Sequence, residues 1–225
     1  MRIRTIALLC LSTLLTTTGL LAAGGSETPP NRDSEVVKTP EEQAADHYNR
    51  GLTYRDKAWK LEAKLANATD AKQREKTEKK IARSYESAVE EFVSAVNLNP
   101  QMFQAFSSLG YALRKTGKYG EALVAYDRAL ALNPDYTEAV EYRAEAYLGL
   151  NRFEEAKQAY MQLFQADRAK ADELLEAMQK WVESRRGDPA GLDAGQIDAF
   201  AAWVDERAEL SAVTAPVSEL RERSW

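Results

Sequence analysis

Apolar residues recur three or four positions apart along the middle and C-terminal parts of the chain, with polar residues between them. This spacing places apolar side chains on one face of an α-helix, so it predicts a series of amphipathic helices. Residues 171–183 illustrate the pattern, because Leu174, Met178 and Val182 share one such face. The predicted fold class is therefore all-α, which agrees with a composition rich in alanine, leucine, glutamate, lysine and arginine.

The N-terminal segment follows a different pattern. Arg2 and Arg4 precede an apolar run from Ile6 to Leu21, and small residues follow at 22–25. A basic start, an apolar stretch and a small-residue end are the three regions of a secretory signal peptide, so residues 1–25 are predicted to be one. An uncleaved membrane anchor is the alternative, which the short, threonine-diluted run disfavours.

The predicted export signal is not of the lipoprotein type. A bacterial lipoprotein signal needs a small residue directly before the modified cysteine, whereas Leu9 precedes Cys10. The mature protein is therefore expected to be periplasmic or secreted, with no stable membrane span after cleavage.

Residues 26–43 are polar and hold three prolines. Such a composition cannot bury enough apolar surface to fold, so this segment is predicted to be a disordered spacer. At its end, Thr39, Pro40 and Glu42 are typical of a helix start, with a capping hydroxyl, a proline at the first helical position and acids in the first turn.

A period of 34 residues organises the next part of the chain. The residues that keep this step are Asn99-Pro100 and Asn133-Pro134; Ala88, Ala122 and Ala156; Tyr85, Tyr119 and Phe153; and Phe92, Tyr126 and Tyr160. A fixed period of this length is typical of stacked helix–turn–helix units. The pattern resembles the tetratricopeptide repeat (TPR) family, as in an exported bacterial TPR protein, and the resemblance implies a solenoid of helical hairpins.

The resemblance divides the folded part into a TPR-like domain at 44–183 and a C-terminal helix and tail at 190–225. The expected units are repeats at about 44–102, 103–136 and 137–170 and a capping helix at 171–183. Asp193 and Gln196 form a capping box for the C-terminal helix. Residues 210–225 are expected to be a loose tail.

The second repeat is the clearest copy. Gly110 and Ala122 allow its two helices to approach closely, Tyr126 fills the space beside them, and Gly117 serves the turn. In the third repeat Arg168 stands where proline would end the unit. Its second helix is therefore expected to run on toward residue 170.

The first repeat carries about 25 more residues than the intact copy, within the segment 55–84. Helix-forming residues dominate it and 67–70 is its one turn signal, so both repeat helices are predicted to extend into a helical arm. The insertion holds ten cations and five anions. This charge suits an acidic partner, an anionic membrane surface or a cell-wall polymer, whereas the mixture of both signs favours a solvated hairpin. Trp59, Leu61 and Leu65 are expected to meet another chain.

Composition excludes several kinds of chemistry. One cysteine and one histidine exclude a disulfide framework, a zinc cluster and catalytic groups that need a second histidine. His47 is accordingly expected to have a structural role. A sequence pI near 5.2 argues against nucleic-acid binding. We expect no cofactor, no metal and no enzymatic activity, although an enzyme using Glu141 or Glu145 is an open alternative.

The resemblance also implies where a partner would bind. In TPR proteins the concave face, lined by the first helix of each repeat, receives a peptide. The positions that match this face are Tyr48, Leu52, Arg55, Gln104, Ser107, Tyr111, Arg114, Lys115, Glu138, Glu141 and Glu145. The implied function is a non-enzymatic protein–protein interaction adaptor or scaffold of the bacterial periplasm or cell envelope.

Self-association, occlusion of the groove and chaperone binding are alternatives to this function. A self-associating structural protein would use the arm or the C-terminal helix. That helix either extends the cap or folds into the groove as an internal ligand. Finally, Tyr48, Leu52 and Glu138 replace residues of the chaperone-tail clamp found in one TPR subclass, so a chaperone-tail role is not predicted.

Overall fold

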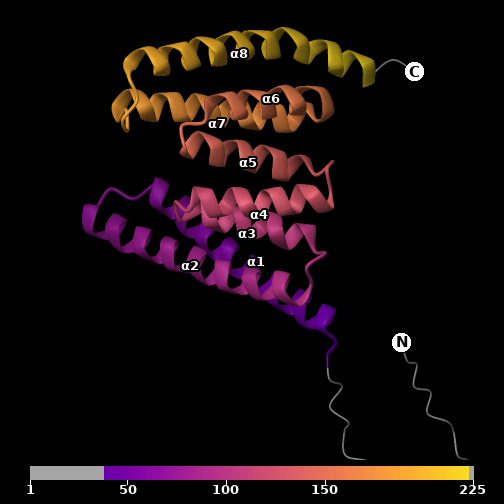
Figure 1. Cartoon of the computed structure of the whole chain (residues 1–225). Helices are drawn as coiled ribbons and strands as arrows, with labels where there is room; N and C mark the ends of the chain where they lie inside the picture. Colours follow the sequence, from indigo (N-terminus) through magenta and orange to yellow (C-terminus); the bar gives the residue numbers. More distant parts are fainter. Residues whose placement is uncertain (1–37, 223–225) are drawn as a thin grey trace, which may run out of the picture. The chain divides into compact units, whose positions relative to one another are not determined.

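The computed structural model describes residues 38–222, and within them the chain forms eight α-helices. The bounds are α1 (Pro40–Ala66), α2 (Ala71–Leu98), α3 (Phe103–Lys115), α4 (Tyr119–Leu132), α5 (Thr137–Gly149), α6 (Phe153–Ala166), α7 (Arg168–Gly187) and α8 (Ala194–Glu222). Figure 1 shows the hairpins α1–α2, α3–α4 and α5–α6 stacked in chain order, followed by α7 and α8. The prediction of an all-α solenoid of helical hairpins is confirmed.

In each of the first two hairpins, the two helices approach most closely where a glycine of one helix faces an aromatic ring of the other. A Cβ atom on Gly51 would lie 2.5 Å from the Phe92 ring, and one on Gly110 would lie 2.6 Å from the Tyr126 ring. Both rings are fully buried. Because these distances are shorter than van der Waals contact, each hairpin packs this closely only with glycine at that position.

The core has two parts that follow the chain order. The first lies mainly among α1 to α4, around Tyr85, Phe92 and Tyr126. The second joins α5 to α8, around Tyr160 and Phe200. Each hairpin therefore buries its apolar face against its neighbours in the stack, as the repeat pattern requires.

The helix start at Thr39 is confirmed. The Glu42 backbone N–H donates to Thr39 Oγ1 at 3.2 Å, and the Thr39 N–H donates to Glu42 Oε2 at 2.8 Å. Residues 40–43 thus belong to α1, so the predicted spacer is wrong at its C-terminal end. Residues 26–37 of the spacer, and the predicted signal peptide at 1–25, lie outside the described residues.

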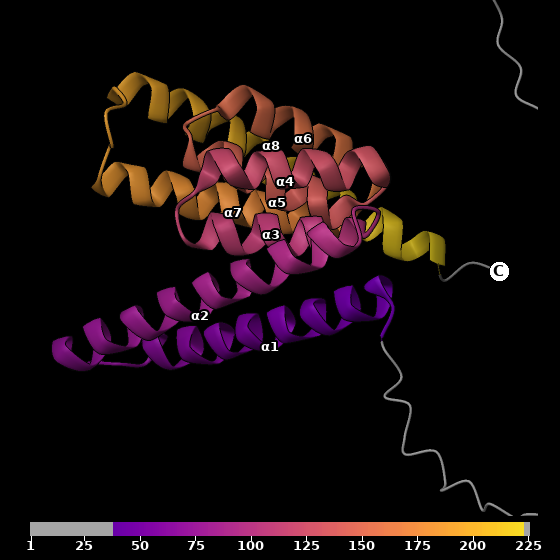
Figure 2. The same ribbon diagram turned by 60° about the horizontal axis from the view of Figure 1, so that its bottom comes forward.

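The insertion extends α1 and α2 on either side of the turn at 67–70, as the sequence predicts. Asp70 caps α2, because its carboxylate accepts the Lys72 N–H at 2.8 Å. Figure 2 shows α1 and α2 side by side and projecting past α3. An ion pair of 2.8 Å between Lys115 Nζ and Glu62 Oε1 ties the middle of this arm to α3.

His47 has the expected structural surroundings. Its Nδ1 lies 2.7 Å from a Glu91 carboxylate oxygen, and Arg50 Nε donates to the same oxygen at 3.0 Å. These contacts join α1 to α2 near the inner end of the hairpin.

The junction of α6 and α7 differs from its prediction. Asp167 has an extended backbone (φ −152°, ψ 95°) and ends α6 at Ala166, so α6 does not run on toward residue 170. The Asp167 carboxylate accepts the Lys170 N–H at 3.2 Å and caps α7. One residue therefore ends one helix and starts the next, and α7 is longer than the predicted cap.

The C-terminal helix is longer than expected. Its capping box is confirmed, since Asp193 Oδ1 accepts the Gln196 N–H at 2.8 Å and the Asp193 N–H donates to Gln196 Oε1. The prediction of a loose tail is wrong for 210–222, which continue α8. Arg168 Nη2 donates to Ser211 Oγ at 3.0 Å and to Thr214 Oγ1 at 2.7 Å, and these bonds anchor the extension to α7.

Helix α8 packs against α7 and covers the end of the stack. The Phe200 ring lies 5.3 Å from the rings of Phe153 and Trp181, and the Trp203 ring lies 5.5 Å from that of Tyr160. The alternative in which this helix occupies the groove is thereby wrong. In the described part of the chain, no helix combines the length and the apolar character needed to cross a membrane.

Candidate functional site

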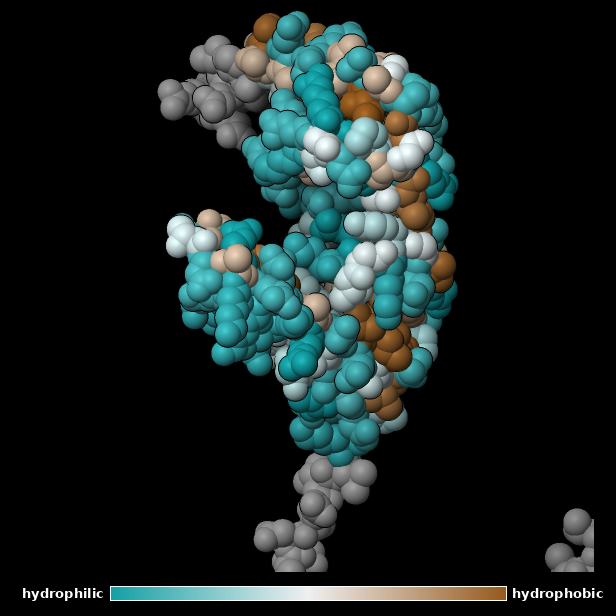
Figure 3. Space-filling model, turned by 90° about the vertical axis from the view of Figure 1, so that its left-hand side faces the viewer, coloured by the Kyte–Doolittle hydropathy of each residue, from teal (hydrophilic) through white to brown (hydrophobic). Residues whose placement is uncertain are grey.

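Helices α1, α3 and α5 together enclose a small pocket, which we name the concave pocket. It has a volume of about 140 Å³ and is lined by Tyr48, Arg55, Trp59, Ser107, Ser108, Tyr111, Tyr136, Glu138 and Tyr142. Five of these residues were predicted for the groove: Tyr48, Arg55, Ser107, Tyr111 and Glu138. Figure 3 shows a hollow on one side of the molecule and apolar side chains along the opposite edge.

Tyr111 lies at the centre of an aromatic cluster in this pocket. Its ring centroid is 5.1 Å from that of Tyr142 and 5.9 Å from that of Trp59, both edge to face. Trp59 Nε1 donates to Tyr111 Oη at 2.7 Å. The cluster joins α1, α3 and α5, so it forms a continuous aromatic surface across the first helices of all three hairpins.

Opposite charges line the concave pocket. The Arg55 guanidinium stacks 4.2 Å from the Trp59 ring centroid and pairs with Asp56 at 2.8 Å. Glu138 lies beside Tyr136, whose pKa is raised to about 12 by burial and by this carboxylate. A bound segment would therefore meet aromatic rings flanked by one cation and one anion.

A second depression continues from α3 and α5 to α7. It has a volume of about 500 Å³ and is lined by Arg114, Lys115, Tyr119, Glu145, Leu148, Gly149, Ala177, Lys180, Trp181, Ser184 and Arg185. Arg114, Lys115 and Glu145 were predicted for the groove, whereas the residues of α7 were not. The apolar spacing of 171–183 predicts only a capping helix, and no local pattern indicates that Trp181 of α7 donates to the Leu148 carbonyl of α5.

A charged cluster forms the floor between the pocket and the depression. Arg114 Nη1 donates to Glu145 Oε2, and the Arg114 guanidinium lies over the rings of Tyr111 and Tyr142. Glu141 is only 4% exposed, so it lies in this floor rather than on the groove surface. Its Oε2 atom has no hydrogen-bond partner and is 4.0 Å from Lys170 Nζ.

The environment of Glu141 changes its charge. Burial raises the pKa of this carboxyl to about 8, and the negative charge of Glu145 contributes in the same direction. The group is therefore mostly neutral at pH 7. Glu141 and Glu145 share a site in which one carboxylate is neutralised by Arg114 and the other retains its proton.

The remaining predicted residues lie elsewhere. Leu52 is half-buried against the first core, and Gln104 is exposed outside both depressions. Sequence reasoning missed Trp59, Tyr136, Tyr142 and Ser108. Trp59 carried a usable signal, because it follows Arg55 by four positions and so shares its helix face. Trp59 is expected from the sequence to contact another chain, whereas in the structure its indole donates to Tyr111 of α3 and remains 40% exposed.

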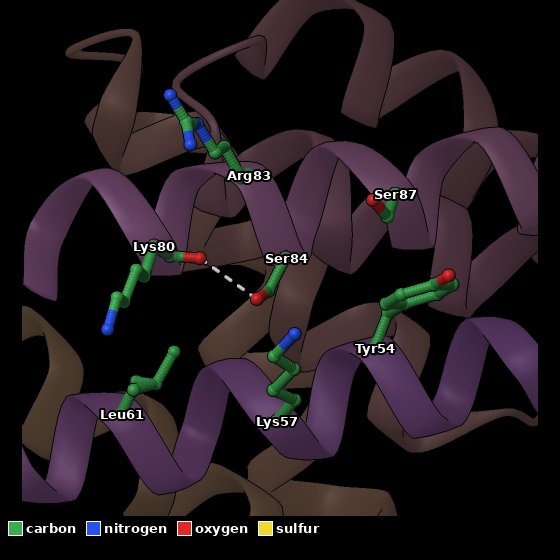
Figure 4. Close-up of a pocket in the computed structure, with 7 residues that line it drawn as sticks. All are labelled: Tyr54, Lys57, Leu61, Lys80, Arg83, Ser84 and Ser87. Atoms are coloured by element: carbon green, nitrogen blue, oxygen red, sulfur yellow. Dashed lines mark hydrogen bonds between the residues drawn. The ribbon is translucent and has the colours of Figure 1, made fainter.

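The arm carries a separate, cationic groove of about 390 Å³ between α1 and α2. Figure 4 shows its lining residues: Tyr54, Lys57, Leu61, Lys80, Arg83, Ser84 and Ser87. The Ser84 hydroxyl donates to the Lys80 carbonyl at 2.9 Å. Within the described residues, none of the three cations has a carboxylate within 4.0 Å. We name this surface the arm groove.

The described residues offer no candidate for a bound metal. No group of three or more His, Cys, Asp or Glu side chains among them is arranged to hold an ion.

Comparison with protein families identifies two of the three hairpins. Residues 103–136 and residues 143–170 each match a model described as "Tetratricopeptide repeat". These segments correspond to α3–α4 and to most of α5–α6 with the start of α7. The chain therefore contains TPR repeats.

Curated relatives share only part of this chain. Mouse "Sperm-associated antigen 1" is 34% identical over 131 residues, which cover 55% of this chain and 14% of that protein. "Protein O-mannosyl-transferase Tmtc3" of Drosophila melanogaster is 32% identical over 71 residues, covering 32% of this chain and 8% of that protein. The chain thus spans a small fraction of the length of these relatives.

Among solved structures, "First TPR of Spaghetti (RPAP3) bound to HSP90 peptide SRMEEVD" is similar, with a TM-score of 0.48 and 19% identity. The match covers 64% of this chain and 97% of that one.

Proposed function

We propose that this protein is a non-enzymatic adaptor that holds a peptide segment of a partner protein in the concave pocket. The aromatic cluster of Trp59, Tyr111 and Tyr142 carries the proposal, because it spans three repeats and remains partly accessible. Aromatic side chains that combine an apolar face with a polar edge are frequent at protein–protein binding sites.

The charges around the pocket define the peptide chemistry that we propose. An apolar or aromatic side chain would lie on Tyr111 and Tyr142. A carboxylate beside it would pair with Arg55, and a cation on its other side would pair with Glu138. The arm groove would make a second contact, with acidic residues of the same partner, because its three cations are free of carboxylates in the described residues.

The proposed adaptor carries out no covalent chemistry. Of the two carboxylates considered for an enzyme, Glu145 is paired with Arg114, and Glu141 is only 4% exposed in the floor of the groove. The transferase named among the relatives is matched over 8% of its length, so its activity is not transferred to this chain.

We place this function in the bacterial periplasm or cell envelope. The support is the pattern of residues 1–25, with its basic start, apolar run and small-residue end. Mass spectrometry of the protein recovered from a bacterial envelope fraction is expected to show an N-terminus close to residues 24–26. A full-length chain confined to the cytosol would contradict the location.

Substitution of the pocket is expected to abolish partner capture. Immobilised residues 26–225 would be exposed to envelope extract, and captured proteins identified by mass spectrometry. The Trp59→Ala, Glu138→Lys double variant removes one wall of the aromatic cluster and reverses the pocket's anion. It is expected to bind the captured partner at least tenfold more weakly than the wild type, on the order of 1.4 kcal/mol or more.

A matched control distinguishes damage to the concave pocket from a general effect of the changed net charge. Glu90→Lys makes the same charge change on an exposed position of α2, outside the concave pocket. This variant is expected to keep full affinity, and circular dichroism should show equal helicity for all three proteins. Equal capture by the wild type and the pocket variant would show that the partner binds elsewhere.

A further inference from the structure

The opposite side of the hairpin stack carries an apolar groove, which we name the convex groove. It has a volume of about 540 Å³ and lies between α2 and α4, with α3 forming its floor. Its lining residues are Val89, Val93, Phe106, Leu109, Leu113, Glu121, Val124, Ala125 and Arg128. Seven of these nine residues are apolar, and the two charged ones both belong to α4.

Part of this apolar surface is open to solvent. Val124 is 71% exposed and Val93 is 39% exposed. A single exposed valine is unremarkable, but here the two valines border a continuous apolar depression. The convex groove and the concave pocket share no lining residue: the rims of the groove belong to the second helices α2 and α4, and α3 contributes Phe106, Leu109 and Leu113 to its floor but Ser107, Ser108 and Tyr111 to the pocket.

The charges of α4 indicate what covers this groove. Glu121, Val124, Ala125 and Arg128 are spaced so that they share one helix face. Glu121 precedes Val124 by three positions, and Arg128 follows Ala125 by three. An antiparallel copy of α4, related by a two-fold axis between Val124 and Ala125, therefore places Glu121 of each copy opposite Arg128 of the other.

Neither Glu121 nor Arg128 forms an ion pair within the described part of one copy. No ion pair within 4.0 Å involves Glu121 or Arg128 in the described residues. The Arg128 guanidinium lies 5.8 Å from the Phe106 ring centroid, at the edge of the groove. The pattern is thus self-complementary: apolar at its centre, with one anion and one cation at symmetry-related ends.

We propose that the convex groove is an interface between two copies of this chain. Two α4 helices pack antiparallel about a two-fold axis, Val124 of each copy inserts toward the apolar groove of the other, and two Glu121–Arg128 pairs close the ends. Such an isologous contact uses the same patch on both subunits. Both concave pockets remain open in the dimer, so the interface does not depend on the proposed adaptor function.

Sedimentation of residues 26–225 over a series of concentrations tests the interface. The wild type is expected to change from monomer to dimer as concentration rises. Val124→Asp, which buries a charge at the axis, is expected to weaken dimerisation at least tenfold. Val213→Asp is the matched control, because Val213 is 73% exposed on α8, away from the groove, and it should dimerise like the wild type.

Charge exchange tests the antiparallel register. Glu121→Arg and Arg128→Glu each place like charges opposite one another, so each single variant should dimerise at least tenfold more weakly. The double variant should recover wild-type dimerisation. An equimolar mixture of the two single variants should form heterodimers, because one copy then carries two arginines and the other two glutamates.

Several results would overturn the proposal. A wild type that stays monomeric at every concentration would do so, as would equal behaviour of Val124→Asp and Val213→Asp. Failure of both the double variant and the mixture to recover dimers would exclude the antiparallel register. Because all substituted positions are exposed, circular dichroism is expected to show unchanged helicity throughout.

Discussion

Replacement of Gly110 by alanine is expected to lower the free energy of unfolding by about 2 kcal/mol. Alanine is the better helix former by up to about 1 kcal/mol, so propensity alone predicts stabilisation. The added Cβ would, however, lie 2.6 Å from the Tyr126 ring, which is fully buried and cannot move without displacing the α3–α4 hairpin. Steric overlap in the core outweighs propensity, because overpacking commonly costs about 1–3 kcal/mol. Urea unfolding followed by circular dichroism measures the change.

Gly120→Ala provides the opposite control. Gly120 is also helical, but a Cβ placed there has no neighbouring atom within 4 Å. This variant is expected to gain about 0.5 kcal/mol from the lower backbone entropy of the unfolded chain. If the two substitutions shifted stability in the same direction, the close packing of Gly110 against Tyr126 would be disproved.

Replacement of Glu141 by glutamine is expected to stabilise the protein at alkaline pH, by roughly 4 kcal/mol at pH 8. The pKa of Glu141 is raised from 4.5 to about 8, mainly because burial disfavours its charged form. Between these two values the unfolded chain releases a proton that the folded chain keeps. Stability conferred by the protonated carboxyl is therefore complete below pH 4.5 and is lost as the pH rises toward 8.

Glutamine keeps the shape of the protonated side chain and does not titrate. The variant should therefore differ little from the wild type at pH 5, and its stability should fall less between pH 5 and pH 8. Urea unfolding at the two pH values gives the comparison, and the exposed Glu90→Gln on α2 is the control. Parallel pH profiles for wild type and Glu141→Gln would show that this carboxyl is not buried as a neutral acid.

The hairpins were predictable because their determinants are local and repeated. Gly110 and Tyr126 belong to one repeat, and the 34-residue step places similar residues in the neighbouring repeats. The arm was predictable for a related reason, since the turn at 67–70 is the only break in a long helix-forming insertion. The capping boxes at Thr39 and Asp193 are likewise read from residues three positions apart.

The missed features depend on contacts between distant residues. Arg168 anchors α8 through hydrogen bonds to Ser211 and Thr214, which are more than 40 positions away. No local sequence pattern predicts these two bonds. Asp167 was overlooked because the absence of proline suggested a continuous helix. An aspartate that caps the following helix ends the preceding one just as effectively.

The helix face on which the site residues lie was predictable, but how deeply each residue is buried was not. The resemblance to TPR proteins assigns Tyr111 and Glu138 to the concave face, and the structure brings them into one pocket. The same resemblance could not distinguish these two residues from Glu141, which is buried in the floor. Nor could it show that α1 lies close enough to α3 for Trp59 to reach Tyr111, because that contact spans 52 positions.

The position of Trp59 gives the protein an optical reporter of its own. The sequence holds four tryptophans, and Trp181 and Trp203 are packed among the aromatic rings of α6 and α8. Trp59 instead presents a partly hydrated indole at the rim of the concave pocket. Fluorescence emission from an indole moves to shorter wavelength when water leaves its surroundings. Pocket occupancy can therefore be followed spectroscopically in the unlabelled protein, with Trp59→Phe supplying the baseline.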